Sequence, residues 1–210
     1  MINLKDYIKT KVVKIDVDGV IRDMLGALCK LYFTFDPNVN RDFIRNYEVN
    51  VSFPLIKSEI GIEAHDYFFK EHSDDVNFNM AVPFNGAKEA IDKLKKAGYK
   101  IVIVTKQTSP KSKINTIKFL THYGIYYDDL CFTGDKWLIE SDFMIDDNPE
   151  FLENKVDDTP LDNRFIIDAP YNRFYTDFKR FDSLMDAVDY IIETYGFGNE
   201  DKENNNHDRG

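Results

Sequence analysis

Short apolar runs recur along this chain and limit the folds that it can adopt. They cover residues 11–17, 99–105, 128–134, 141–147 and 164–170. The first two are rich in β-branched residues and are too short for helices, which is typical of strands buried on both faces of a parallel sheet. The segments between the runs have a helical pattern. This alternation predicts an α/β fold with a mostly parallel sheet.

Three of the intervening segments have apolar residues at helical spacing. They are residues 86–98, a stripe formed by Ile114, Ile117 and Leu120, and residues 184–195. Gly98 is placed to end the first helix, and Ser183 with Asp186 forms a capping box before the third. These stripes predict helices that bury one face against the sheet.

Residues 23–80 do not follow this alternation, and they separate the first strand from the next by more than a simple crossover needs. The segment is unusually aromatic. We interpret it as a small, mostly helical cap inserted after the first strand, which leaves residues 1–22 and 81–195 as the α/β catalytic core. The polar tail, residues 196–210, has little to bury and is predicted to be disordered.

The composition excludes several classes of protein. The chain has 210 residues and a net charge of −10, which argues against a protein that binds nucleic acid polymers. Its two cysteines, Cys29 and Cys131, have no metal-binding spacing and suggest a reduced, cytoplasmic setting. No segment approaches the roughly 18 apolar residues of a membrane helix. We therefore expect a cytoplasmic protein without membrane contact.

Polar side chains follow four of the predicted strands, at the point where each strand ends. They are Asp16 and Asp18 in "DVDG", Thr105, Lys136 in "TGDK", and Asp146 and Asp147 in "IDDN". Because the carboxyl ends of parallel strands meet at one edge of the sheet, we expect these side chains to share a crevice.

This set of residue types suits phosphoryl transfer to an aspartate. A carboxylate nucleophile and a phosphate are both anionic, and a hard cation such as Mg²⁺ offsets their repulsion. A lysine neutralises further charge, and a hydroxyl with loop N–H groups can hold phosphate oxygens. A second carboxylate two residues along can protonate the leaving oxygen and later activate water.

The order of these motifs resembles the haloacid-dehalogenase-like superfamily of phosphatases. More narrowly, the chain is similar to the 5'(3')-deoxyribonucleotidases, over roughly residues 11–190. The likeness includes "FNMAVPFNGAKEAIDKLKKAGYKIVIVT", "TGDKWLIESDFMIDDNP" and "FIIDAPYN". It implies a Rossmann-like core that dephosphorylates a small phosphate ester, most narrowly a deoxyribonucleoside 5'(3')-monophosphate. A homodimer is compatible with this reading.

The resemblance also implies roles for individual residues. Asp16 would be the nucleophile and Asp18 the general acid/base, while Thr105 and Lys136 would bind phosphate. Mg²⁺ would be held by Asp16, the backbone carbonyl of Asp18, and Asp147, with Asp146 adjacent.

Other assignments stay open. Lys113 or Lys118 could replace Lys136 as the site lysine, and the "TSP" segment at 108–110 could replace Thr105. Alternative functions are a related phosphatase acting on a sugar phosphate or a nucleic-acid end, a phosphorylation-controlled receiver module, and a non-catalytic binding protein. The sequence does not choose the base or the 5' versus 3' position.

The predicted cap offers candidates for substrate contact. A nucleobase can stack on an aromatic ring, and we select Phe33, Phe53 and Phe69 for this. His65 and His72 lack the spacing of a metal site and are interpreted as part of a solvated helix face.

Overall fold

Six parallel strands form one sheet in the order β3-β2-β1-β4-β5-β6. The computed structural model describes residues 10–46 and 48–196. The strands are β1 (Val12–Ile15), β2 (Lys100–Thr105), β3 (Asp129–Phe132), β4 (Phe143–Asp146), β5 (Arg164–Ile167) and β6 (Lys179–Phe181). The prediction of an α/β fold with a mostly parallel sheet is confirmed.

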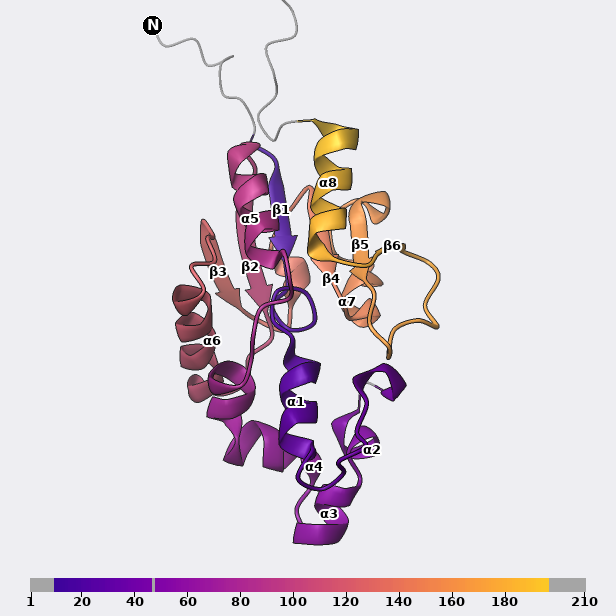
Figure 1. The fold of residues 1–210 in the computed structure, drawn as a ribbon. Helices are drawn as coiled ribbons and strands as arrows, with labels where there is room; N and C mark the ends of the chain where they lie inside the picture. The colour runs from indigo at the N-terminus through magenta and orange to yellow at the C-terminus, as the bar shows by residue number, and fades with distance from the viewer. Residues whose placement is uncertain (1–9, 47, 197–210) are drawn as a thin grey trace, which may run out of the picture.

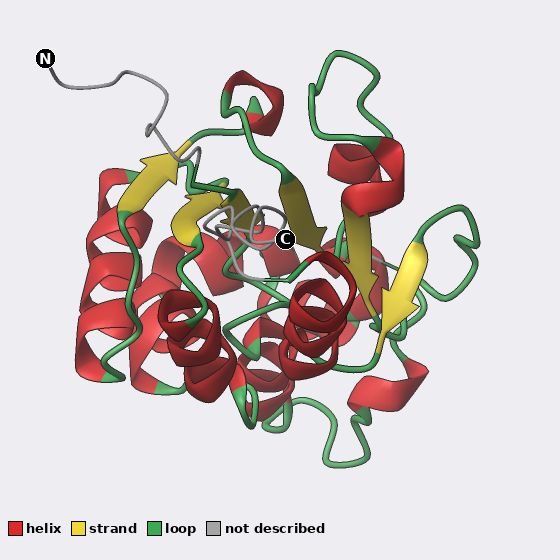
Figure 2. Ribbon diagram, turned by 90° about the horizontal axis from the view of Figure 1, so that it is seen from above, coloured by secondary structure: helices red, strands yellow, loops and turns green. Residues whose placement is uncertain are grey.

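One face of the sheet is apolar and is covered by helices. Alternate residues of the central strands, such as Ile15, Ile103 and Ile145, are buried there. The helices α5 (Ala87–Lys96) and α8 (Leu184–Tyr195) pack on this face and against each other. Figures 1 and 2 show the strands as one layer with helical segments on both sides. Burial of this face holds the strands in register.

The opposite face contains buried charge as well as apolar residues. Lys14, in the middle of β1, forms an ion pair of 2.6 Å with Asp157, and both side chains are about 1% exposed. Arg164 donates to backbone carbonyls of the loop after α7 (Pro149–Leu152), including Thr159 O and Asp157 O. The helix α6 (Pro110–His122) links β2 to β3. The short helices η5 (Lys136–Leu138) and η6 (Leu161–Asn163) lie between later strands.

The segment between β1 and α5 is helical and has a hydrophobic cluster of its own. Its elements are α1 (Met24–Tyr32), η2 (Arg41–Phe43), α2 (Val49–Ser52), α3 (Leu55–Ile60), α4 (Ala64–Asp66), η3 (Tyr67–Glu71) and η4 (Asp75–Asn79). The rings of Tyr32, Phe53 and Phe68 meet edge to face at its centre. Figure 1 shows α1–α4 beyond the carboxyl end of β1. We call residues 24–79 the helical insertion; its status as a separate cap stays a prediction.

Some local expectations differ from the structure. The helix α6 forms, but of its predicted stripe only Leu120 is buried, while Ile114 is 54% and Ile117 42% exposed. The buried face instead carries polar residues, Asn115 and Thr116, because α6 packs against η4 of the helical insertion. The strand β6 and the short α7 were not predicted. The expected disordered tail falls almost wholly on residues 197–210, outside the described residues.

No helix within the described residues is long and apolar enough to cross a membrane.

Candidate active site

The candidate site lies where the strand order reverses. From β1 the chain adds β2 and β3 on one side, then β4, β5 and β6 on the other. The loops after β1 and β4 therefore diverge and leave a crevice at the carboxyl ends of these two strands. Asp16 follows β1, while Asp146 ends β4 and is followed by Asp147. The topology thus brings together carboxylates that are 130 positions apart in the chain.

A close turn at Gly19 brings the two loops together. Gly19 has φ +82°, and a Cβ built on it would lie 2.1 Å from Asp147 Oδ2. A side chain at position 19 would be strained by this φ and would collide with the carboxylate. Glycine is therefore the residue that allows the loop after β1 to pass over Asp147.

Lys136 lies at the centre of the acidic group. Its Nζ is 2.6 Å from Asp146 Oδ2 and 3.0 Å from Asp16 Oδ1, and its side chain is 2% exposed. The 3₁₀ helix η5 carries it, and Lys14 Nζ holds two carbonyls of this segment, Lys136 O and Ile139 O, at 3.1 Å. Lys14 therefore holds the backbone of this segment, and the two carboxylates hold the ammonium of Lys136.

Burial and charge shift the pKa values of these groups. Desolvation raises the pKa of Asp16 to about 7, although Lys136 acts to lower it. Desolvation and then the charges of Asp146 and Asp16 raise the pKa of Asp147 well above its usual value. Burial alone would lower the pKa of Lys136, but the two nearest carboxylates, led by Asp146, raise it overall. One ammonium does not compensate three buried carboxylates.

The three carboxylates fit a divalent cation. Asp16, Asp146 and Asp147 each offer an oxygen within 4.8 Å of the others. The buried Oδ1 of Asp147 has no hydrogen-bond partner, and Oδ1 of Asp16 has its contact with Lys136 without hydrogen-bond geometry. Oxygen-rich acidic sites of this kind suit Mg²⁺. The side chain of Asp18 is not part of this trio, and a ligand role for its backbone carbonyl stays a prediction.

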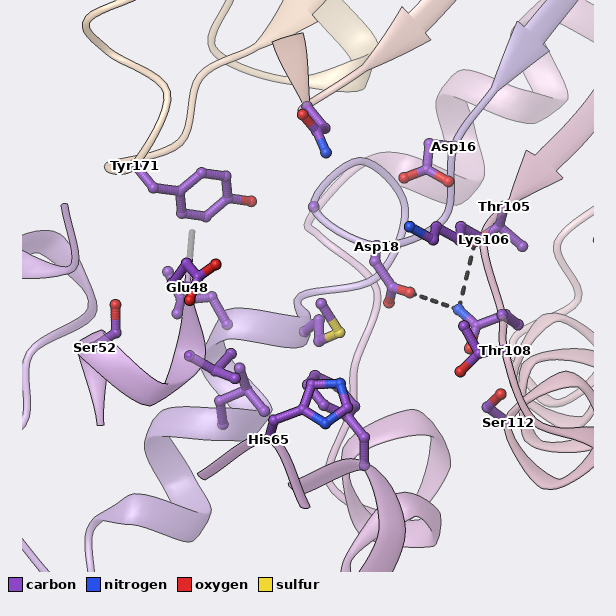
Figure 3. A pocket seen from close by; sticks show the side chains of 18 of the residues that line it. Asp16, Asp18, Glu48, Ser52, His65, Thr105, Lys106, Thr108, Ser112 and Tyr171 are labelled. Carbon is purple, nitrogen blue, oxygen red and sulfur yellow. Dashed lines mark hydrogen bonds between the residues drawn. The ribbon is translucent and has the colours of Figure 1, made fainter. Parts of the chain in front are cut away.

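Asp18 instead faces Arg22 and Gln107. Arg22 donates from Nε to Oδ1 at 2.6 Å and from Nη2 to Oδ2 at 3.0 Å, and Gln107 Nε2 donates to Oδ2 at 2.8 Å. In Figure 3, a dashed line that ends at the carboxylate of Asp18 marks the last of these hydrogen bonds. Asp18 still lines the pocket beside Asp16. The two predicted catalytic carboxylates therefore share one crevice but have different partners.

The predicted phosphate-binding residues lie on the same wall. Thr105 ends β2, is 1% exposed and lines the pocket together with Thr108 and Ser109 of the alternative "TSP" segment. Of the three candidate lysines, Lys136 lines the pocket and contacts Asp16. Lys113 instead points toward the ring of Phe132, 5.8 Å from its centroid.

The pocket has a volume of about 620 Å³ and extends from the sheet to the helical insertion. Its far wall carries Glu48, Asn50, Ser52, His65 and Phe69. Figure 3 shows Asp16, Asp18 and Thr105 on one side, with Glu48 and Ser52 opposite. This volume is within the range of small-molecule sites.

Sequence reasoning missed several residues of this pocket. Tyr171, whose hydroxyl donates to Asp147, and Gln107 gave no signal beyond their position after a strand. His65 was interpreted as a solvated helix residue, and it is exposed, but it also lines the pocket and packs 5.2 Å from the Phe69 ring. Of the three chosen rings, Phe33 is outside the lining and 56% exposed.

Known structures share this fold. A crystal structure titled "putative beta-phosphoglucomutase" from Thermotoga maritima matches with a TM-score of 0.59 and 15% identity, over 88% of this chain and 99% of that one. A haloacid-dehalogenase superfamily hydrolase of subfamily IA from Geobacter sulfurreducens matches with a TM-score of 0.55 and 16% identity, over 88% and 98%. These likenesses support the haloacid-dehalogenase-like core.

Sequence comparisons identify the family. A curated protein of Chlorobaculum tepidum, named "Putative 5'(3')-deoxyribonucleotidase", is 27% identical over 148 residues, which are 66% of this chain and 70% of that protein. The family model described as "5' nucleotidase, deoxy (Pyrimidine), cytosolic type C protein" matches residues 10–196. The resemblance inferred from the motifs is therefore confirmed. The chain belongs to this family of haloacid-dehalogenase-like phosphatases, the cytosolic type C 5' nucleotidases.

Proposed function

We propose that the protein hydrolyses deoxyribonucleoside monophosphates, at the 5' or 3' position, through a phosphorylated Asp16. The observation that carries this proposal is the contact of Asp16 with Lys136 beside two further buried carboxylates, at the switch point of the sheet. Membership of the nucleotidase family and the name of the Chlorobaculum relative support the substrate class.

In the first step, an oxygen of Asp16 attacks phosphorus and the bond from phosphorus to the nucleoside oxygen breaks. Lys136 and the Thr105 hydroxyl, with the N–H groups of the following loop, stabilise the charge on the phosphoryl oxygens. Bound Mg²⁺, held by Asp16, Asp147 and the backbone carbonyl of Asp18, with Asp146 adjacent, would supply charge neutralisation between nucleophile and phosphate.

Asp18 handles the proton in both steps. It gives a proton to the departing nucleoside oxygen, and the nucleoside leaves as an alcohol. It then takes a proton from the water that attacks the phosphorylated Asp16. The bond from phosphorus to the Asp16 oxygen breaks, which releases inorganic phosphate and restores the carboxylate.

We propose that the helical insertion acts as a cap that excludes water and contacts the base and sugar. Its wall of the pocket combines an aromatic ring, Phe69, with polar groups such as Glu48 and His65. A small nucleotide fits this pocket, and the net charge of −10 disfavours a nucleic acid polymer. A cytoplasmic location and a homodimer stay predictions.

The test is a phosphate-release screen over deoxyribonucleoside 5'- and 3'-monophosphates and sugar phosphates, with and without Mg²⁺. We expect Mg²⁺-dependent release from nucleotides, and loss of release to background in Asp16→Asn. The matched control is Asp142→Asn. Asp142 lies outside the pocket lining, and its Oδ2 accepts a hydrogen bond of 2.8 Å from Val12 N at the start of β1. Activity on sugar phosphates alone would overturn the substrate class. Normal turnover by Asp16→Asn would overturn the mechanism.

A further inference from the structure

Arg22 is a fully buried charge beside the proposed acid/base. Its side chain is 0% exposed, and it follows Asp18 by four residues, after the turn at Gly19. The guanidinium donates to both oxygens of Asp18, at 2.6 and 3.0 Å. Such a fork fixes the plane of a carboxylate as well as its position.

The other side of the guanidinium contacts two different elements. Nη1 donates to Asn77 O at 2.8 Å, and Nη2 to Asn77 Oδ1 at 3.3 Å. Nη1 also lies 3.3 Å from Thr116 Oγ1 of α6, and the group lies over the Phe119 ring, 5.2 Å from its centroid. Arg22 therefore joins the nucleophile loop to the last turn of the helical insertion and to α6.

Asn77 is itself held in place. Its amide nitrogen donates to Ser73 O at 2.8 Å and to Ser73 Oγ at 3.2 Å, and the residue is 2% exposed and lines the pocket. The amide oxygen is consequently turned toward Arg22. A displacement of η4 would move this oxygen, then the guanidinium, and with it the carboxylate of Asp18.

A merely structural role explains this arrangement poorly. Burying an arginine and an aspartate costs desolvation energy that an apolar pair of similar volume would avoid. The apolar Phe119 and the neighbouring core would accept such a pair. An apolar pair would provide no oriented carboxylate. Here Arg22 fixes the orientation of the Asp18 carboxylate, and Gln107 adds a third donor at 2.8 Å.

We propose that Arg22 is a positioning residue: it orients Asp18 for proton transfer and couples that orientation to segment 75–79 of the helical insertion. The inference rests on the proposed function, because it needs Asp18 as the acid/base. It predicts that loss of the fork lowers the rate most for substrates whose leaving oxygen needs a proton.

The experiment compares two substrates in the full-length protein with Mg²⁺. Deoxythymidine 5'-monophosphate has an alkoxide leaving group that needs a proton, whereas the p-nitrophenolate of p-nitrophenyl phosphate leaves without one. Arg22→Lys keeps the charge and loses the fork. We expect its kcat/KM to fall about tenfold or more further with the nucleotide than with the aryl ester. The losses are compared as kcat/KM because this quantity includes only the steps up to release of the leaving group, whereas kcat also includes hydrolysis of phosphorylated Asp16, in which Asp18 acts on both substrates alike. If Arg22→Lys does not fold, Asn77→Ala is measured instead. It keeps the contacts of Arg22 with Asp18 and should show a smaller selective loss with the nucleotide.

A double mutant shows whether Arg22 acts through Asp18. Asp18→Asn alone should lower the rate more with the nucleotide than with the aryl ester, and adding Arg22→Lys should not increase this difference. Arg164→Lys is the matched control, since Arg164 is another buried arginine that donates to carbonyls, away from the pocket lining. It should leave the ratio of the two rates unchanged.

Two results would overturn the inference: equal losses on both substrates in Arg22→Lys, or additive selective losses in the double mutant. Either would indicate a structural ion pair. If Asp18→Asn itself treats both substrates alike, the acid/base assignment in the proposed function fails, which is a distinct outcome.

Discussion

The two walls of the pocket differ in how firmly their side chains are held. On the sheet wall, Thr105 is 1% and Lys136 2% exposed, and Lys136 contacts two carboxylates. On the wall of the helical insertion, Glu48 and His65 are exposed, and Phe69 is half-buried against His65. One wall is a buried charge network and the other is an open polar and aromatic surface.

This difference separates two tasks. Buried charges persist only where partners fix them, so the sheet wall can present a phosphate with preorganised groups. Exposed side chains keep rotamer freedom and can be exchanged at small cost in stability. We therefore expect substitutions on the sheet wall to change kcat, and substitutions on the opposite wall to change KM and selectivity.

Two buried lysines beside the sheet offer a sharper contrast, although they are close enough for Lys14 Nζ to bind the backbone oxygen of Lys136. Lys14 has one carboxylate partner, Asp157 at 2.6 Å, and burial lowers its pKa. Lys136 has two carboxylate partners, and their charges raise its pKa in spite of burial. We therefore propose that Lys136, which is surrounded by excess negative charge, binds phosphate, and that the one-to-one buried pair of Lys14 is structural.

Replacing each lysine by methionine tests this contrast and should give the largest effect after loss of the nucleophile. Lys136→Met should lower kcat about 10²–10³-fold with any phosphate ester, because it removes a charge aimed at the phosphoryl oxygens. Lys14→Met should lower the free energy of unfolding and lower kcat less than about tenfold. Steady-state kinetics and urea unfolding, on protein shown to be folded by circular dichroism, measure both.

The comparison would break if Lys14→Met lost as much turnover as Lys136→Met while remaining folded. The support that Lys14 Nζ gives to Lys136 O and Ile139 O would then be as important as the site ammonium.

Phe69→Ala tests the opposite wall. If its ring stacks on the base, KM for deoxythymidine 5'-monophosphate should rise about 5- to 140-fold, since one stack contributes roughly 1–3 kcal/mol. KM for glycerol 2-phosphate, which has no ring, should stay the same. Phe33→Ala is the matched control, because Phe33 is exposed and outside the pocket lining. Equal changes with both substrates would show that Phe69 is part of the core of the helical insertion.

The sheet wall could be predicted from the sequence because its rules are local and topological. Asp16, Thr105 and Asp146 each end a recognisable apolar strand, and parallel strands bring their carboxyl ends together. Gly19 after the acidic pair marked the tight turn. These signals need no knowledge of side-chain packing.

The wall of the helical insertion could not be predicted in the same way. Its helices are short, and the spacing of Phe33, Phe53 and Phe69 does not say which ring faces the pocket. Phe53 and Phe69 both line it, but Phe53 is only 1% exposed and packs in the cluster of the insertion, whereas Phe33 is in solvent. Arg22 is an unmarked residue in an apolar stretch, and its burial depends on Asn77, 55 residues later. The polar face of α6 was missed because its partners, Arg22 and η4, lie outside the sheet.

The last expected effect concerns stability rather than turnover, and it depends on the excess of carboxylates on the sheet wall. The pKa of Asp16 is raised to about 7 from its ordinary value of 3.8, with desolvation as the main cause. Between these two values the folded, metal-free protein keeps a proton that the unfolded chain has released. The free energy of unfolding should therefore fall as the pH rises through this window and level off above about pH 7.

Asp16→Asn removes this titration, so the metal-free variant should gain stability relative to the wild type as the pH rises from about 4 to 7. At pH 8, Mg²⁺ should reverse the order, because the ion binds the folded wild type more tightly than a site with one carboxylate fewer. Urea unfolding at several pH values, with a chelator or with Mg²⁺, measures both effects. Asp142→Asn, outside the acidic trio, should show neither effect. A stability difference that does not change with pH would mean that Lys136 already compensates the charge of Asp16. The two walls would then differ in exposure but not in uncompensated buried charge.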